Sequence, residues 1–159
     1  IMLAMEGIPA FYIHSLLATK NDYKKLKHTS LKRSINRHQW QLPELEKKLN
    51  LRSHHKKIFL KLTSLISLRK KQAAFHPNAT QFTLELNESI FGLWRQSLDR
   101  EQSIFSVHNI SNKTIEFNPS QLNMIETDQW HDLISKKIVK NLYKEIKLKP
   151  YQSMWLSNK

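Results

Sequence analysis

The sequence predicts an α/β segment followed by a small all-β domain, and three observations carry this prediction. A short apolar run at residues 8–13 follows a glycine, residues 53–73 have the apolar spacing of a long helix, and beyond residue 77 apolar and polar residues alternate. This order indicates a buried strand of the parallel type, then a helix, then an antiparallel sheet.

Length and composition exclude several classes of protein. A chain of 159 residues is too short for a complete eight-fold β/α barrel, which needs roughly 200 residues. The absence of cysteine excludes a disulfide framework, a zinc–thiolate site and a thiol nucleophile, and it suits a cytoplasmic protein. Two glycines cannot form a dinucleotide-binding or Walker loop. No apolar run approaches the roughly 20 residues of a membrane helix.

The first residues resemble the interior of a longer polypeptide. Position 1 is not methionine, no basic leader is present, and residues 1–6 have the pattern of a final helical turn that ends at Gly7. We therefore expect the chain to be the C-terminal part of a longer protein. The apolar run Ile8–Ile13, with Pro9 near its start, is the predicted strand, buried on both faces.

Residues 14–40 are polar, basic and without sustained periodicity, which predicts a long functional loop with short helical turns. One or two helical turns are expected over Leu42–Leu49, after Pro43. The main helix is predicted over Ser53–Ala73, with Ser53 as its N-cap and Pro77 just beyond its end.

The second half has the pattern of many short strands. The predicted strands lie at residues 82–86, 90–96, 103–110, 114–117, 129–134, 145–148 and 151–156, and a turn is expected at Asn87–Glu88. Trp94, Trp130 and Trp155 fall within these apolar runs. We expect the three indoles to pack in the core rather than to form an exposed platform for sugars.

The formal net charge is +13, and it is unevenly distributed. Residues 1–72 hold 16 Lys and Arg against four Asp and Glu, whereas residues 73–159 hold ten against nine. This shift predicts two domains, residues 1–76 and 77–159. A basic nucleic-acid-binding module, with Tyr23, His38 and Trp40 stacking on bases, is the alternative from another class. The lysines of 56–71 lie opposite an apolar helical face, which favours an ordinary solvated helix.

The remaining polar residues do not form a recognisable catalytic or metal site. The eight histidines lack metal-ligand spacing, so we expect no metal. His14 and Ser15 have no acidic partner nearby in the sequence, so a Ser-His-Asp triad is unsupported.

Three segments resemble glycoside hydrolase family 13. Gly7–Tyr12 is similar to the last barrel strand of that family. His14–Asp22, followed by Arg33–Arg37, resembles the loop after that strand in the sucrose phosphorylase branch, and Leu148–Leu156 is similar to the closing strand of its C-terminal domain. The resemblance implies the last strand and helices of a (β/α)8 TIM barrel, followed by a small antiparallel β domain.

The resemblance also implies a function and three binding residues. The implied protein is a retaining α-glucoside phosphorylase, which transfers glucose from an α-glucoside such as sucrose to inorganic phosphate without a cofactor. Arg33 falls on the family's glucose-binding arginine, although Ser34 replaces the aspartate that follows it in the family. Asn21 and Asp22 match residues that shape the loop near the sugar.

The family's catalytic carboxylates lie on earlier barrel strands, so we expect this chain alone to be inactive. A hydrolase or glucosyltransferase of the same superfamily is the nearest alternative, and the oligomeric state and the acceptor are not determined. Lys20, Lys24 and Lys25 carry a further hypothesis, that their charge attracts phosphate toward the site.

Overall fold

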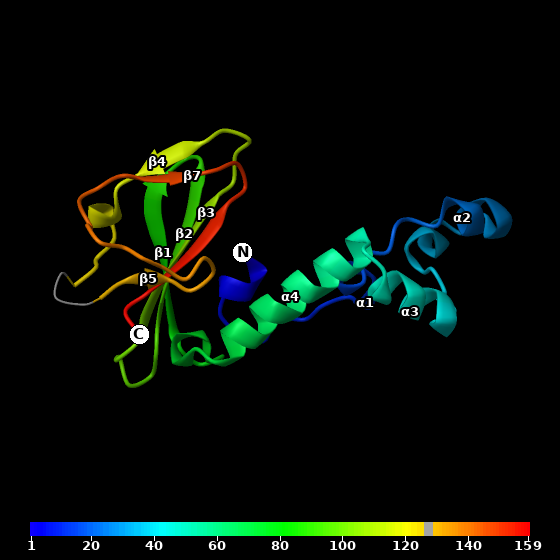
Figure 1. Cartoon of the computed structure of the whole chain (residues 1–159), viewed down its shortest axis with the longest axis horizontal. Coiled ribbons are helices and arrows are strands. Elements are labelled where there is room, and N and C mark those ends of the chain that lie inside the picture. The colour runs from blue at the N-terminus through cyan, green and yellow to red at the C-terminus, as the bar shows by residue number, and fades with distance from the viewer. Residues whose placement is uncertain (126–128) are drawn as a thin grey trace. The chain divides into compact units, whose positions relative to one another are not determined.

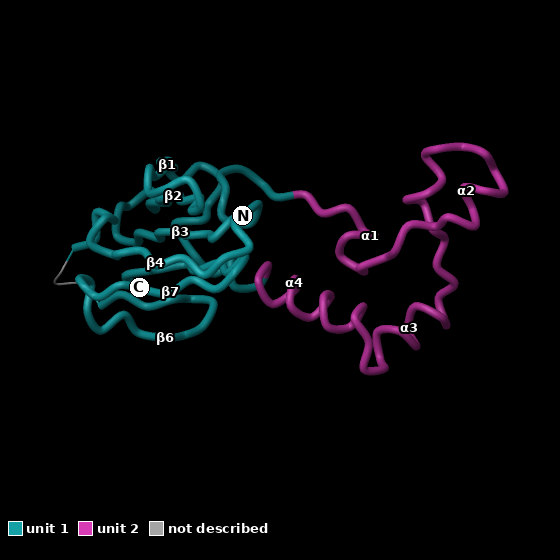
Figure 2. Tube along the Cα trace, turned by 90° about the horizontal axis from the view of Figure 1, so that it is seen from above, with its two compact units in different colours: residues 1–9, 67–159 teal, residues 10–66 magenta. Residues whose placement is uncertain are grey.

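The computed structural model describes residues 1–125 and 129–159, which form two compact units. Residues 1–9 and 67–159 make the first, called here the β unit, and residues 10–66 make the second, called the helical unit (Figure 2). The coarse prediction of a helical N-terminal part followed by antiparallel sheets is confirmed (Figure 1).

The predicted helices are present with small changes at their ends. The helices of the chain are α1 (Ile13–Leu16), α2 (Tyr23–Thr29), α3 (Leu42–Asn50) and α4 (His54–Lys70), with short 3-10 turns η1 (Met2–Ala4), η2 (Lys32–Asn36), η3 (Ala73–Phe75) and η4 (Pro119–Gln121). Ser53 caps α4, because its Oγ accepts a hydrogen bond from the Lys56 amide at 3.1 Å. Pro43 lies in the first turn of α3, where its missing N–H costs no helical hydrogen bond.

The predicted strand at Ile8–Ile13 is wrong for this structure. Residues 8–12 have no regular secondary structure, Ile13 begins α1, and Ile8 is 83% exposed rather than buried. A strand is stable only when its backbone groups pair with a neighbouring strand, and no described segment pairs with this one. An apolar composition indicates burial but does not by itself provide that partner.

The β unit contains a six-stranded antiparallel sheet and a two-stranded sheet. The larger sheet has the order β1-β2-β3-β8-β5-β6, and the smaller pairs β4 with β7. The strands are β1 (Thr80–Asn87), β2 (Ile90–Gln96), β3 (Ser103–Asn109), β4 (Ile115–Phe117), β5 (His131–Asp132), β6 (Lys137–Ile138), β7 (Ile146–Leu148) and β8 (Ser153–Ser157). The expected strand at 129–134 is shorter than predicted, and β6 was not predicted at all.

The core of the β unit lies between the sheets and the connections that cover them. Its buried members are Ile90, Phe105, Val107, Phe117, Leu122, Trp130, Leu148, Met154 and Leu156. Trp155 is also buried and Trp94 packs against the core, so the predicted packing role of the three tryptophans is confirmed. Close packing favours glycine at position 92, because a Cβ there would lie 3.0 Å from the Cβ of Leu84 on β1.

Strand β1 is an edge of the large sheet and has an irregular register. It pairs with β2 alone among the described strands, and the pairing shifts between Leu84 and Asn87. The opposite edge, β6, is only two residues long.

Two buried arginines bind backbone carbonyls in the β unit. Arg69 donates to the carbonyl oxygens of Leu3 and Gly7, the second at 2.9 Å. Arg95 donates to those of Ala4, His76 and Ala79 at 3.4, 2.9 and 3.3 Å. Burial lowers the pKa of both guanidinium groups, and for Arg95 the nearby charge of Arg69 adds to the effect.

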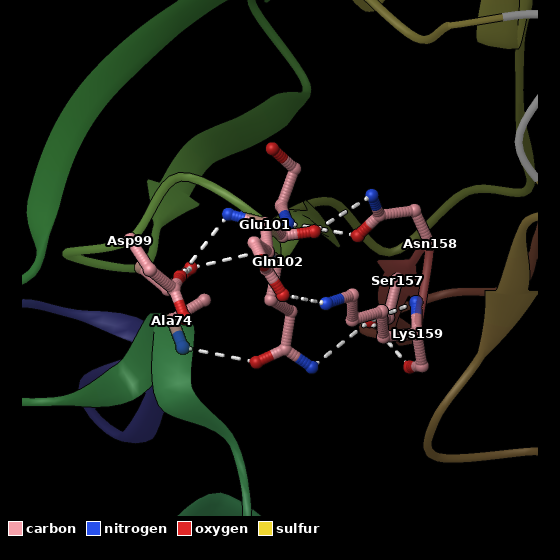
Figure 3. Close-up of polar contacts among 9 residues, drawn as sticks. Ala74, Asp99, Glu101, Gln102, Ser157, Asn158 and Lys159 are labelled. Atoms are coloured by element: carbon pink, nitrogen blue, oxygen red, sulfur yellow. Dashed lines mark hydrogen bonds and ion pairs between the residues drawn. The ribbon is translucent and has the colours of Figure 1, made fainter.

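A buried glutamine joins three parts of the same unit (Figure 3). Gln102 accepts a hydrogen bond from the Ala74 amide at 3.0 Å and donates to Gln72 Oε1 at 2.8 Å and Ser157 Oγ at 3.3 Å. Its side chain therefore connects the segment after α4 with the start of β3 and the end of β8.

Among the described residues, no helix combines the length and the apolarity needed to cross a bilayer.

Replacing Arg95 should destabilise the β unit strongly. In Arg95→Met the carbonyls of Ala4, His76 and Ala79 lose buried donors, so we expect the free energy of unfolding to fall by about 3 kcal/mol. Denaturant unfolding followed by tryptophan fluorescence measures this. The exposed Lys70→Met is the charge-matched control; equal stability of both variants would contradict a structural role for Arg95.

His108 should make the free energy of unfolding depend on pH. It is buried with Nδ1 2.8 Å from Ser153 Oγ, and burial lowers its pKa to about 3. The unfolded chain binds a proton near pH 6.5, so the free energy of unfolding should fall between pH 6.5 and 3, by up to about 1.4 kcal/mol per pH unit. His108→Gln should reduce the pH dependence of the free energy of unfolding in this range, whereas His28→Gln, at an exposed position, should not. Identical slopes in all three proteins would contradict the prediction.

Candidate functional site

The helical unit contains a cleft of about 860 Å³. Its walls come from residues 19–22, helix α2, residues 38–40, and parts of α3 and α4. The charged side chains along it are Lys20, Lys24, Lys25, Lys48, Asp22 and Glu44. The cleft therefore carries more basic than acidic side chains.

Asp22 organises the loop that forms one wall of this cleft. Its Oδ1 accepts the Lys25 amide at 2.9 Å, which caps α2, and its Oδ2 lies 2.9 Å from His38 Nδ1. The hydrogen bond with His38 is the main cause, and that with the Lys25 amide the next, of a lowered pKa at Asp22. Its own amide donates to the Ile35 carbonyl at 2.6 Å. One residue thus connects three segments of the loop.

Trp40 forms an aromatic part of the wall. Its indole Nε1 donates to Thr19 Oγ1 at 2.9 Å, and its ring meets His38 edge-on at 4.7 Å between centroids. The buried His55 of α4 also meets the indole edge-on, at 5.3 Å between centroids, and donates from Nδ1 to the Leu17 carbonyl at 2.8 Å. These contacts fix the position of the indole before any ligand enters.

A smaller hollow of about 390 Å³ shares Thr19, Lys20 and Asn21 with the cleft. Tyr12 lines it and donates from its hydroxyl to the Asn36 carbonyl at 2.9 Å. Asn21 thus borders both spaces.

The structure brings Asn21 and Asp22 together at the cleft but does not bring Arg33 there. Arg33 is exposed on η2 and is not among the residues that line either space. The adjacent Ser34 is buried, with its Oγ donating to the Leu31 carbonyl at 2.7 Å and bonded to Thr29 Oγ1 at 2.8 Å. The binding roles of Arg33, Asn21 and Asp22 remain predictions.

The sequence did not identify His38 as the partner of Asp22 or Thr19 as the partner of Trp40. The two residues of each pair are 16 or more positions apart in the sequence, so neither helical nor strand periodicity relates them. His38 directly follows Arg37, the end of the family-like stretch, and that position was the one available signal.

Most of the charged side chains that line the cleft are lysines. Asp22 is occupied by His38 and by the α2 cap, and four lysines line the same space. Within the described part of the chain, no group of three or more His, Asp or Glu side chains is arranged to hold a metal ion.

Known proteins resemble this chain over nearly all of its length. It is 32% identical to the glucosylglycerate phosphorylase of Escherichia coli (strain K12) over 158 residues, 98% of the chain and 26% of that protein. It is also 32% identical to the sucrose 6(F)-phosphate phosphorylase of Thermoanaerobacterium thermosaccharolyticum, over 70% of the chain and 21% of that protein. No protein-family model matches the chain.

A solved structure resembles the fold. AmyP in complex with maltose aligns with a TM-score of 0.56 at 18% identity, over 69% of this chain and 22% of that one. The chain thus spans about a quarter of the length of the relatives that it matches.

Removing the Asp22 carboxylate should loosen the cleft wall. In Asp22→Ala the α2 cap is lost and His38 loses its partner. Faster hydrogen exchange at the Lys24 and Lys25 amides would show this. Asp22→Asn is the matched control, because its side chain can still cap α2. Unchanged exchange in Asp22→Ala would contradict the organising role.

Proposed function

This chain is homologous to phosphorylases of glycoside hydrolase family 13, and from that homology we propose that it is part of a retaining α-glucoside phosphorylase. The complete enzyme would transfer glucose from an α-glucoside to inorganic phosphate and release α-glucose 1-phosphate. Glucosylglycerate, sucrose and sucrose 6-phosphate are the substrates to test first.

The observation that carries this proposal is 32% identity over 158 residues to a glucosylglycerate phosphorylase. The similarity includes the cleft loop, so it is not limited to the common packing of a β domain. The resemblance to AmyP concerns the fold, and at 18% identity it does not distinguish one reaction from another.

The chain's own share of the reaction is to hold the sugar. Retaining transfer needs two carboxyl groups roughly 5 Å apart across the glycosidic bond. As the family resemblance implies, we assign these groups to polypeptide outside this chain, which would be inactive alone. Arg33 would bind glucose hydroxyls with its guanidinium, while Asn21 and Asp22 would shape the loop beside it.

The activity test uses the complete translation product of the gene that encodes this chain. Each α-glucoside is supplied with and without inorganic phosphate, and α-glucose 1-phosphate and free glucose are measured. Phosphate-dependent release of α-glucose 1-phosphate would support the proposal. Free glucose alone would indicate a hydrolase of the same superfamily, transfer to another sugar a glucosyltransferase, and no product the failure of the proposal.

Arg33→Ala should lower kcat/KM of that enzyme by about 100-fold, because hydroxyl contacts that tighten in the transition state would be lost. Arg52→Ala, another exposed arginine of the helical unit, is the matched control and should retain full activity. Unchanged kinetics in Arg33→Ala would remove Arg33 from the site.

A further inference from the structure

Helix α1 ends in a turn that returns the backbone toward the start of the helix. The Thr19 amide donates to the His14 carbonyl at 2.8 Å, and the Ala18 amide donates to the Ser15 carbonyl at 3.2 Å. These two bonds form a Schellman motif, in which Ala18 takes the left-handed conformation with a φ of 52°. Glycine is the usual residue there because a Cβ is unfavourable, so contacts around the turn must hold the alanine in place. The turn brings Thr19 back to His14.

The Thr19 hydroxyl joins two aromatic side chains. Its Oγ1 lies 2.9 Å from Trp40 Nε1 and 3.1 Å from His14 Nδ1, and it makes no other hydrogen bond within the described part of the chain. An indole N–H can only donate, so Oγ1 accepts from Trp40. The hydroxyl proton then has His14 Nδ1 as its acceptor. A neutral imidazole that accepts at Nδ1 carries its proton on Nε2.

Neighbouring rings hold the two ends of this hydrogen-bonded row. His55 of α4 meets the Trp40 ring edge-on at 5.3 Å between centroids. Tyr12 meets the His14 ring in the same way at 5.1 Å, and its hydroxyl is bonded to the Asn36 carbonyl at 2.9 Å. The orientation of the imidazole is therefore fixed before a ligand enters.

His14 lines the smaller hollow of about 390 Å³, and small-molecule pockets measure roughly 300 to 1,000 Å³. Among the described residues around this hollow there is no carboxylate, and neutral hydroxyl and amide side chains outnumber the charged one, Lys20. Groups of this kind suit a ligand that is rich in hydroxyls. Because Thr19 occupies Nδ1 of His14, Nε2 is the ring nitrogen that remains for the ligand, and no described residue bonds to it.

We propose that His14 donates a hydrogen bond from Nε2 to a hydroxyl oxygen of the α-glucoside, and that Thr19 and Trp40 are positioning residues that keep the proton on that nitrogen. This inference rests on the proposed function and adds a binding residue to it. The donor is neutral, so it recognises a hydroxyl group rather than a charge. A hydrogen bond made equally in the ground state and the transition state lowers KM without raising kcat.

Substitutions of His14 in the complete protein test the donor. His14→Leu should raise the KM for the α-glucoside about tenfold with kcat nearly unchanged, because one neutral hydrogen bond is lost. His14→Gln should keep the KM near that of the wild type, since its amide nitrogen can take the place of Nε2. An equal rise in both variants, or a loss confined to kcat, would overturn the donor role.

Substitutions of Thr19 test the positioning. Thr19→Val should raise the same KM about threefold, whereas Thr19→Ser keeps the hydroxyl and should not. Thr63→Val, on α4 and outside both spaces, is the matched control and should change nothing.

The tautomer of His14 gives a direct readout of the same relation. In the complete protein labelled with ¹⁵N-histidine at pH 8, the His14 ring, assigned with His14→Gln, should carry its proton on Nε2. Thr19→Ser should preserve this form, and Thr19→Val should give a mixture of both tautomers. A proton on Nδ1 in the wild-type protein would overturn the proposal.

A binding measurement keeps this inference separate from the proposed function. Calorimetric titration of the complete protein with each α-glucoside, without phosphate, gives a Kd that does not require phosphorolysis. If phosphorolysis is absent, yet His14→Leu weakens binding about tenfold and His14→Gln does not, the proposed function fails and the hydrogen bond stands. If phosphorolysis occurs and His14→Leu binds as tightly as the wild type, this inference alone fails. Absence of binding by any α-glucoside would overturn both.

Discussion

The β unit depends on two guanidinium groups that replace missing secondary structure. The carbonyls of residues 3, 4, 7, 76 and 79 lie outside the strands and accept hydrogen bonds from Arg69 or Arg95 instead of from a strand partner. Buried carbonyls without donors are costly, and each arginine can satisfy several at once. Phe75 lies beside both cations, with ring-to-guanidinium distances of 5.1 and 6.0 Å. This arrangement includes residues 1–9 in a unit whose remainder begins at residue 67.

In the helical unit, too, side-chain hydrogen bonds take the place of regular secondary structure. Its loop has little regular structure, and its order comes from side chains that bind two or three segments each: Asp22 with α2 and His38, Lys25 with residues 37 and 39, and Trp40 with Thr19. Because these contacts use Asp22, while the ammonium groups of Lys20, Lys24 and Lys48 bond to no described residue, the cleft is both organised and basic.

The sequence predicted elements whose stabilising interactions are close in the chain. Helix α4 has its Ser53 cap one residue before it, and β1 to β3 follow one another through short turns, the first of these strands with a clear period-two pattern. The failures have a different origin. Ile8–Ile13 resembles a strand in composition but has no partner strand here, and β6 is two exposed residues without a distinctive pattern. At the cleft, the loop motif predicted Asn21 and Asp22, whereas the contact with His38 depends on a loop path that local propensity does not encode.

The two ends of the large sheet differ in how they limit intermolecular pairing. An outer strand offers a row of backbone groups to which another chain can add. On β1 the register shift between Leu84 and Asn87 interrupts that row, and on β6 only two residues are available, one of them Lys137. At the edges of the large sheet, a further chain can therefore add a regular strand only along the first half of β1, where the half-exposed Phe82 lies. A few backbone positions along one half of β1 are consequently where a further strand would extend the large sheet.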